Sequence, residues 1–436
     1  MDATKINVKK KISAVVICSI VFGIVYNFSA WYATTLVYVP SFVFSFEKYI
    51  PFIPWTIIPY LTSGIFFSTV FFFCKNKEQL SSLLKRLLFV IIIAGMVYLL
   101  VPLKFSFIRA ETNTSLFQFL FQFLTMVDSP YNQAPSLHVA FAFVFWTIFK
   151  DFKTKWRNVI AIWLILLGLS TLTTYQHHIM DVIAGAILAQ VSFIIFPARR
   201  NTIKLRNFHI ANYYFLVGWL VVLLFVVLSD FYTFYYLILI WPSIVLFLVG
   251  YYYQKNTSHF LKKGSGTIPW YKKIVYGPYL LVYWFFWKFL RKNKKPIEVL
   301  DNIFISSKLD SVEIYNFNFN KNTLVYDFSA ELEEHRILRE KSQYYSIPLL
   351  DIGAFDTIKI KKIVEEISEN YKQLPQDGKI LIHCTMGYSR STFIAILVVK
   401  NVLSLPVEKA IEKVKDIHKN AIIHPYLQDF LNTFTI

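Results

Sequence analysis

The sequence predicts two parts: an all-helical domain that spans a membrane several times, followed by a smaller domain of alternating strands and helices. Two observations carry this prediction. First, 56% of the 436 residues are apolar, and several apolar runs approach the roughly 20 residues that a bilayer-spanning helix needs. Second, the composition becomes that of a soluble protein from about Lys295, where short strands alternate with helices in a compact α/β pattern.

Eight spans are expected, and the Lys and Arg residues between them predict the orientation. Basic residues gather before the first span and after the second, fourth, sixth and eighth, whereas the alternate loops hold few. Positive charge favours the cytoplasmic side, so the N-terminus and all residues from 254 onward are expected in the cytoplasm of a multi-pass inner (cell) membrane protein. The expected spans are residues 12–34, 55–74, 87–103, 136–150, 158–175, 178–196, 211–229 and 232–252.

Residues 274–290 form a further apolar, aromatic-rich run with Lys and Arg on both flanks. Positive charge on both sides argues against a crossing and favours a segment that lies in the membrane interface. The expected domains are therefore residues 1–253 in the membrane, a basic linker over 254–296 and a cytoplasmic domain over 297–436.

The charge and the cysteine content exclude several classes of protein. The net charge is +18, but the basic residues cluster between apolar runs, which indicates contact with anionic lipid and not with nucleic acid. Cys18, Cys74 and Cys384 are too few and too scattered for a disulfide framework or a zinc site. We expect neither a metal nor a cofactor, and the sequence defines no oligomeric state.

The elements of the C-terminal domain follow from periodicity. Residues 303–305 and 323–326 are expected to be short strands, and residues 357–373 an amphipathic helix with apolar positions at helical spacing. Helices are also expected over residues 391–402, 406–419 and 424–434.

The stretch from Ile380 to Ser391 is the strongest functional signal. An apolar run typical of a buried strand ends in His383-Cys384, and Arg390 follows after five residues. Such a strand delivers Cys384 into a loop whose N–H groups, with the N-terminus of the next helix, converge on a spot suited to a phosphate dianion. This positive field favours the nucleophilic thiolate. Arg390 can hold two phosphoryl oxygens, and Ser391 can donate a hydrogen bond to the sulfur. The loop amides expected to bind phosphate belong to Thr385, Met386, Gly387, Tyr388 and Ser389.

This pattern resembles the Cys-x5-Arg phosphatases, and the short domain around it is most similar to their dual-specificity branch. The resemblance implies a general acid on a loop upstream of the cysteine. Asp351 stands where the family places that acid, and Asp356 is the alternative. The competing interpretation is a buried structural Cys384 before a helix, with Arg390 solvated.

A second set of polar residues lies in the apolar half. Three pieces of sequence carry it, and the predicted orientation places all three on the extracytoplasmic face. His177 and Asp181 are four residues apart, so on a helix the carboxylate can orient the imidazole for attack on phosphorus. His138 could protonate the leaving group. The groups that could hold the phosphoryl oxygens are Lys104, Arg109 and Ser136.

These pieces, over about residues 50–200, resemble the type-2 phosphatidic acid phosphatase superfamily, which implies a six-span core. The sequence departs from the family pattern at three motifs. Lys104 and Arg109 are too close together and Ala110 replaces a Pro, Leu137 replaces a Gly, and Thr171 stands where the third motif has an Arg. Pro-Ser-Leu-His and His-His-x-x-Asp are more similar to the inositol-phosphorylceramide-synthase branch, which transfers headgroups between lipids. His178 is expected to be a neighbour of the nucleophile. The competing interpretation is snorkelling Lys and Arg with interfacial His.

Three functions follow as expectations. The first is a membrane phosphatase that hydrolyses phosphomonoesters of phospholipids or phosphoinositides through a phosphocysteine, with a second histidine-based site outside. The second is a lipid headgroup transferase or lipid phosphatase whose main activity uses His177. The third is a Tyr/Ser/Thr protein phosphatase tethered by an inactive membrane scaffold.

Overall fold

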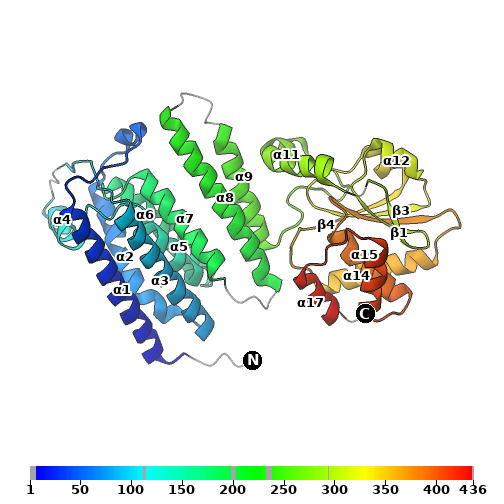
Figure 1. Cartoon of the computed structure of the whole chain (residues 1–436), viewed down its shortest axis with the longest axis horizontal. Coiled ribbons are helices and arrows are strands. Elements are labelled where there is room, and N and C mark those ends of the chain that lie inside the picture. The colour runs from blue at the N-terminus through cyan, green and yellow to red at the C-terminus, as the bar shows by residue number, and fades with distance from the viewer. Residues whose placement is uncertain (1–5, 111–113, 198–202, 232–237, 293, 435–436) are drawn as a thin grey trace. The chain divides into compact units, whose positions relative to one another are not determined.

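The computed structural model describes residues 6–110, 114–197, 203–231, 238–292 and 294–434. The chain forms two compact units, one of residues 1–200 and 212–244 and the other of residues 201–211 and 245–436 (Figure 1). The first unit is helical and the second is mixed α/β, which confirms the predicted fold class. The second unit begins before the expected border at residue 297, because residues 245–296 pack with it.

Most helices of the first unit correspond to expected spans. Its short 3₁₀ segments are η1 (Ser45–Tyr49), η2 (Pro54–Thr56) and η3 (Val70–Phe73). The helices are α1 (Val8–Thr35), α2 (Ile57–Thr69), α3 (Lys77–Leu100), α4 (Ser115–Val127), α5 (Leu137–Phe149), α6 (Thr154–Thr173) and α7 (Ile179–Ile195), followed by α8 (Ile203–Phe231). Helix α4 was not expected from the sequence.

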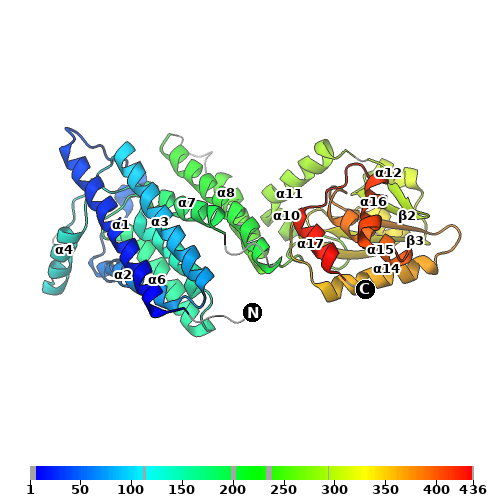
Figure 2. The same cartoon turned by 60° about the horizontal axis from the view of Figure 1, so that its bottom comes forward.

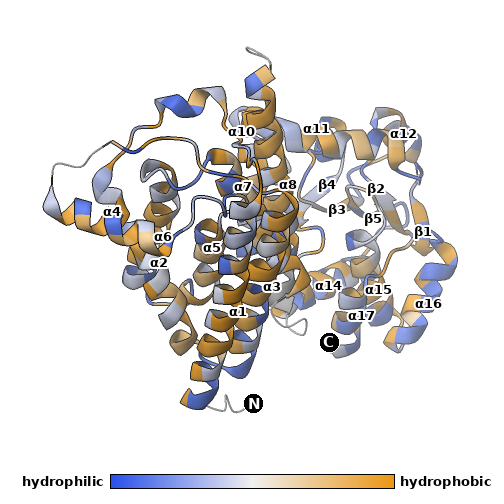
Figure 3. Ribbon diagram, turned by 60° about the vertical axis from the view of Figure 1, so that its left-hand side comes forward, coloured by the Kyte–Doolittle hydropathy of each residue, from blue (hydrophilic) through white to orange (hydrophobic). Residues whose placement is uncertain are grey.

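Five helical segments of the described residues are long and apolar enough to cross a membrane, and apolar residues dominate their length (Figure 3). Helices α5 and α7 have only 13 and 17 residues. At 1.5 Å per residue they are about 20 and 25 Å long, less than the roughly 30 Å of a bilayer core. Helix α5 is instead enclosed, because it packs on α2, α3, α6 and α7. Two expectations lie partly outside the described residues, namely residues 232–237 of the last span and the orienting Arg199 and Arg200.

The second unit is built on a five-stranded sheet in the order β1-β2-β5-β3-β4. Strand β5 is central and runs parallel to both neighbours, β3 and β4 are parallel, and β1 is antiparallel to β2. The strands are β1 (Ile297–Leu300), β2 (Ile303–Ser307), β3 (Thr323–Ser329), β4 (Gln343–Leu349) and β5 (Lys379–Cys384).

Side chains of β5 alternate between two cores, which explains its unbroken apolar run. Ile380 and Ile382 face the core beneath α14 to α17, whereas Leu381 faces the smaller core on the side of α12 and α13. Figures 1 and 2 show α14, α15 and α17 gathered on one side of the strands. The helices are α9 (Ile240–Lys255), α10 (Trp270–Val275), α11 (Gly277–Phe285), the π-helical η5 (Phe286–Leu290), α12 (Ser311–Phe317), α13 (Arg336–Lys341), α14 (Thr357–Lys372), α15 (Arg390–Val402), α16 (Val407–Ile417) and α17 (Pro425–Thr433).

This topology positions the Cys384 loop. Parallel strands β2, β5 and β3 end at one edge of the sheet, the edge where ligands bind in open α/β sheets. Cys384 is the last residue of β5, and α15 starts six residues later at Arg390. Residues Arg390–Val399 of α15 are all buried, so the helix that supplies the loop's positive end is fixed in the core.

Candidate active sites

Cys384 lies at the bottom of the loop between β5 and α15 and is 2% exposed. The loop curls back over the sulfur, so that the backbone N–H of Gly387 donates to Sγ at 3.3 Å. The hydroxyl of Ser391 lies 3.4 Å from the same sulfur. Two hydrogen-bond donors from the loop and the first turn of α15 therefore converge on the position where a sulfur anion would form and later leave.

Gly387 is required by the shape of the loop. Its φ is +78°, a conformation that residues with a Cβ rarely adopt, and a Cβ there would lie 2.6 Å from the backbone nitrogen of Ser307. Two hydrogen bonds hold the loop from outside: Nε2–H of His418 donates to the Gly387 carbonyl at 2.8 Å, and the N–H of Ile422 donates to the Tyr388 carbonyl at 2.8 Å. Burial lowers the pKa of His418, although its hydrogen bond to Gly387 acts in the opposite direction.

Arg390 is held by a carboxylate that the sequence alone did not single out. Its Nη1 lies 2.9 and 3.0 Å from the two oxygens of Glu331 and donates to the Leu349 carbonyl at 2.8 Å. Glu331 also accepts the hydroxyl of Thr385 at 2.6 Å. Burial by itself lowers the pKa of Arg390, but Glu331 and then Asp351 more than reverse this, and the pKa lies well above its usual value. The guanidinium is thus permanently charged and fixed in direction.

The two aspartates considered as general acids have different environments. Oδ1 of Asp351 lies 3.7 Å from Nε of Arg390, and the Asp351 side chain is 40% exposed, so it can reach a substrate at the mouth of the loop. Asp356 is the N-cap of α14, where its carboxylate accepts the N–H groups of Ile358 and Lys359. The geometry therefore favours Asp351 over Asp356 as the proton donor.

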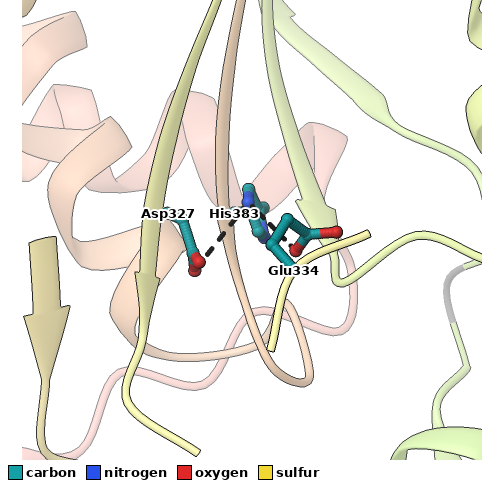
Figure 4. A group of neighbouring side chains, drawn as sticks. All are labelled: Asp327, Glu334 and His383. Atoms are coloured by element: carbon teal, nitrogen blue, oxygen red, sulfur yellow. Dashed lines mark ion pairs between the residues drawn. The ribbon is translucent and has the colours of Figure 1, made fainter. Parts of the chain in front are cut away.

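A buried ionic network surrounds His383, the residue before Cys384 in β5 (Figure 4). Nε2 of His383 lies 3.8 Å from Asp327 and 3.7 Å from Glu334. Lys262 binds Asp327 at 2.6 Å and Lys308 binds Glu334 at 3.3 Å. Burial alone would raise the pKa of Asp327, but the Lys262 ammonium and then His383 hold it well below its usual range. The three ligand-type side chains could face a metal ion, yet two ammonium groups already supply the balancing charge. We therefore describe the network as an ion-pair support for the end of β5.

The sequence-predicted residues of this site come together, and two further residues join them. Ser391 contacts the Cys384 sulfur, Arg390 is near enough to Cys384 for an electrostatic interaction, and Asp351 lies beside Arg390. The hydroxyl of Ser389 has no hydrogen-bond partner among the described residues. Glu331 and His418 were missed, because they are 59 and 31 residues from their partners in the chain and no local pattern marks them.

His138 and His177 line a cavity of about 470 Å³ in the helical unit, and most of the other side chains that line it are apolar. The rings of His138 and His177 lie 5.8 Å apart between centroids, and Nδ1 of His177 lies 3.4 Å from Asp181. The ring of Tyr60 stacks on His138 at 4.2 Å. Two imidazoles, one of them beside a carboxylate, therefore face one space, as nucleophilic attack and leaving-group protonation require.

Packing of α7 on the start of α5 sets this arrangement. The N–H of Ser136 donates to the Asp181 carbonyl at 2.9 Å, and a Cβ on Gly185 would lie 2.5 Å from the Ser136 carbonyl oxygen. His178 points elsewhere: its Nδ1 lies 3.0 Å from Glu47, a carboxylate that also accepts the N–H of Ile179 at the start of α7. His178 is thus part of a buried structural pair.

Neither of the expected phosphate-holding cations lines this cavity. Lys104 is exposed. Arg109 lines a neighbouring cavity of about 330 Å³, and Asp128 lines both cavities. Asp128 was not predicted as a site residue, and its carboxylate accepts hydrogen bonds from the hydroxyls of Tyr26 and Tyr60. The sequence did offer one indication, because Asp128 is a charged residue next to an apolar run, and such residues often belong to functional sites.

Comparison with known proteins supports the division into two parts. A family model described as the PAP2 superfamily matches residues 9–195, which contain all three motifs of the histidine cavity, and this confirms the predicted resemblance. No curated protein matches the chain. The helices and the match together indicate a membrane protein and support phosphatase chemistry.

Solved structures similar to the chain include three that align with about a third of it. They are human DUSP28 (15% identity, TM-score 0.28, 33% of this chain and 95% of that chain), DUSP15 (22%, 0.27, 33% and 88%) and the human tyrosine phosphatase-like serine/threonine/tyrosine-interacting protein (12%, 0.28, 32% and 94%).

Replacing Glu331 with Gln tests how Arg390 is held. Gln keeps the size but removes the charge that compensates the buried guanidinium, and breaking a buried ion pair costs about 3–5 kcal/mol. We expect a lower unfolding temperature of the full chain in detergent and at least about a tenfold loss of kcat/KM on a soluble aryl phosphate. The control is Glu340→Gln, which removes an exposed partner of Arg336. Equal kinetics in the two variants would show that Arg390 is positioned without Glu331.

Acid is expected to weaken the C-terminal unit through His418. Its folded pKa lies below the value of about 6.5 for an unfolded histidine, so the unfolded state binds the proton first. Stability is therefore highest above pH 6.5 and falls as the pH drops below it. In His418→Gln, whose amide can still donate to Gly387, the unfolding temperature should depend less on pH between 7.5 and 5.5. An unchanged pH slope would refute the assignment.

Proposed function

We propose that the protein is a membrane-bound phosphatase that hydrolyses phosphomonoesters, those of phospholipids or phosphoinositides, through a phosphocysteine on Cys384. One observation carries the proposal. At the edge where the parallel strands β2, β5 and β3 end, the N–H of Gly387 donates to the Cys384 sulfur, and the Arg390 guanidinium fixed by Glu331 is near enough to interact with the same cysteine. This arrangement is complementary to a phosphoryl group in transfer, whose charge is spread over its non-bridging oxygens.

In the first step the Cys384 thiolate attacks phosphorus, and the bond from phosphorus to the alcohol oxygen breaks. Asp351 gives its proton to that oxygen, so the alcohol leaves neutral. Arg390 and the loop N–H groups hold the three remaining oxygens. In the second step the Asp351 carboxylate takes a proton from water, the oxygen of which attacks phosphorus. The S–P bond breaks, phosphate leaves, and Ser391 donates a hydrogen bond to the departing thiolate.

A lipid substrate is favoured because the same chain carries the apolar helices and dense basic segments near them. The distribution of Lys and Arg predicts that the Cys384 domain faces the cytoplasm, where anionic headgroups attract basic segments and thiols stay reduced. The histidine cavity would then open on the other side.

The second candidate function belongs to the histidine cavity: lipid headgroup transfer or lipid phosphate hydrolysis by His177. The contact between His177 and Asp181 and the nearby His138 ring favour it. A membrane scaffold without activity is the competing proposal, and it requires no such cavity.

Cys384→Ser should lower phosphate release from a soluble aryl phosphate by on the order of 10⁴-fold, because serine is a poor nucleophile without a base. The assay uses the full chain in lipid nanodiscs, with Cys74→Ala as control, since Cys74 is buried among apolar residues of the helical unit. A Cys384→Ser protein that hydrolyses the substrate at the wild-type rate would overturn the proposal.

The histidine cavity is tested in the Cys384→Ser background, where only this site can act. Mass spectrometry of lipids after incubation should detect a headgroup-exchanged or dephosphorylated lipid, and His177→Ala should abolish it. Asp181→Asn should reduce the rate by on the order of 10²-fold or more by misorienting the imidazole. If the Cys384→Ser protein with His177 and Asp181 unchanged forms no product, the membrane half is an inactive scaffold instead.

A further inference from the structure

Helices α10 and α11 and the π-helical η5 expose several large apolar side chains, which together we call the outer apolar face. Soluble domains rarely leave many large apolar side chains of one segment exposed. The face is defined by six side chains that are each more than half exposed: Trp270, Ile274, Leu281, Phe285, Phe289 and Leu290.

Basic residues lie at both ends of this face. Lys272 and Lys273 lie within α10, Lys288 lies within η5, and Lys292 follows. Aromatic and aliphatic side chains with interspersed lysines are the pattern of a helix that lies in the plane of a membrane surface rich in anionic lipid. A protein partner would need acidic and apolar groups together, and nothing in the described residues indicates one.

The sequence before the face is also apolar. Helix α9 is a 16-residue apolar helix that overlaps the last expected span, and it ends at Lys255, fifteen residues before Trp270. The basic and aromatic face thus follows a hydrophobic helix in the sequence. Among the surfaces that could cover this face, the bilayer is favoured because the face follows an apolar helix in the same chain.

The inner side of the same segment holds the phosphatase machinery. The N–H of Lys292 donates to the hydroxyl of Tyr388, a residue of the Cys384 loop, at 2.5 Å. Trp287 donates from Nε1 to the Lys308 carbonyl at 2.6 Å, and the N–H of Lys308 donates to the Thr385 carbonyl at 3.3 Å. Arg291, 6% exposed, binds Glu313 at 2.7 Å. The segment is therefore fixed to the loop by well-packed polar contacts.

A second tie reaches the loop of the general acid. Asn256, directly after α9, donates from Nδ2 to the Ala354 carbonyl at 3.0 Å and accepts the Ala354 N–H at 3.2 Å. Ala354 lies three residues after Asp351. Both catalytic loops are thus bound to the segment between α9 and β1, whose other side is the outer apolar face.

We propose that the outer apolar face binds the surface of the bilayer and thereby holds the Cys384 loop at the level of lipid headgroups. The outer side of residues 256–292 enters the membrane interface, and the inner side holds the Cys384 loop and the Asp351 loop in place. The binding of the face to lipid stands on its own observations, whereas its effect on lipid turnover rests on the proposed phosphatase function.

Site-directed spin labelling of the full chain tests the binding. Phe289→Cys and Leu281→Cys carry a nitroxide on the face, and Tyr315→Cys on α12, 84% exposed, is the matched control. Nanodiscs contain phosphatidylcholine with phosphatidylglycerol, and unsubstituted protein measures labelling of the three buried cysteines. Collisions with oxygen should dominate at positions 281 and 289, and collisions with a water-soluble nickel chelate at position 315. The proposal would be overturned if the nickel chelate reached the nitroxides at positions 281 and 289 as often as the one at position 315. Dipolar broadening between labels on two copies of the chain would also overturn it, because it would show that a second copy covers the face.

A kinetic measurement separates this proposal from the proposed function. The double variant F285E/F289E should lose about tenfold or more of its activity on a phospholipid monophosphate in vesicles, because charge disfavours entry into the interface. Its activity on a soluble aryl phosphate should stay within about twofold, and Tyr315→Glu should affect neither. If F285E/F289E and Tyr315→Glu were equally active on the lipid substrate, the proposed role of the outer apolar face in lipid turnover would be wrong. If the wild-type protein did not hydrolyse the soluble aryl phosphate, the proposed phosphatase function would be wrong. The spin-label test of membrane binding would still stand.

Discussion

The buried pair of Arg390 and Glu331 is the interaction on which the C-terminal site depends. A guanidinium that is 2% exposed would be strongly disfavoured without a compensating charge, and Glu331 supplies that charge with both oxygens. Because Glu331 also binds Thr385, one carboxylate fixes both the first residue after Cys384 and the arginine that closes the loop. The direction of the guanidinium, and with it the position of a phosphoryl group, follows from this contact.

The two sites differ in how much fixed positive charge they present. The cysteine loop combines a locked arginine, backbone N–H groups and the N-terminus of a buried helix. The sequence has Thr171 where the superfamily pattern that it resembles has an arginine, Lys104 does not line the histidine cavity, and Asp128 does. The hydroxyls of Tyr26 and Tyr60 satisfy that carboxylate in apolar surroundings. A phosphoryl group bound there, as proposed, would depend on the two imidazoles and on Arg109 from the adjoining cavity.

Local patterns predicted much of the C-terminal domain. The amphipathic run 357–373 is α14 (Thr357–Lys372), and the run 391–402 is α15 (Arg390–Val402), because their apolar spacing and flanking caps are local properties. Strands β1 and β4 were missed because they lie near the sheet edges, where half-exposed residues blur the alternation. In the membrane half, α4 was missed because Gln118 and Gln122 interrupt its apolar run.

The residues of the candidate sites divide in the same way. Cys384, Gly387, Arg390 and Ser391 lie within one loop, so their spacing alone predicts their meeting. Glu331, His418 and Asp128 act across long stretches of chain, and only the packing of β3, α16 and α4 against their partners brings them into place. Residues 256–292 also contact the loops of Cys384 and Asp351, and these contacts cannot be predicted from the periodicity of the sequence.

The central claim is that phosphorus is transferred to the Cys384 sulfur during turnover. Intact-peptide mass spectrometry of the full chain, acid-quenched while it hydrolyses a phosphomonoester, tests this directly. The account predicts one added phosphoryl group on the peptide that contains Cys384, and its accumulation in Asp351→Asn, where activation of water is slowed. Steady turnover with the phosphoryl group on a peptide containing His177, and none on the Cys384 peptide, would contradict it.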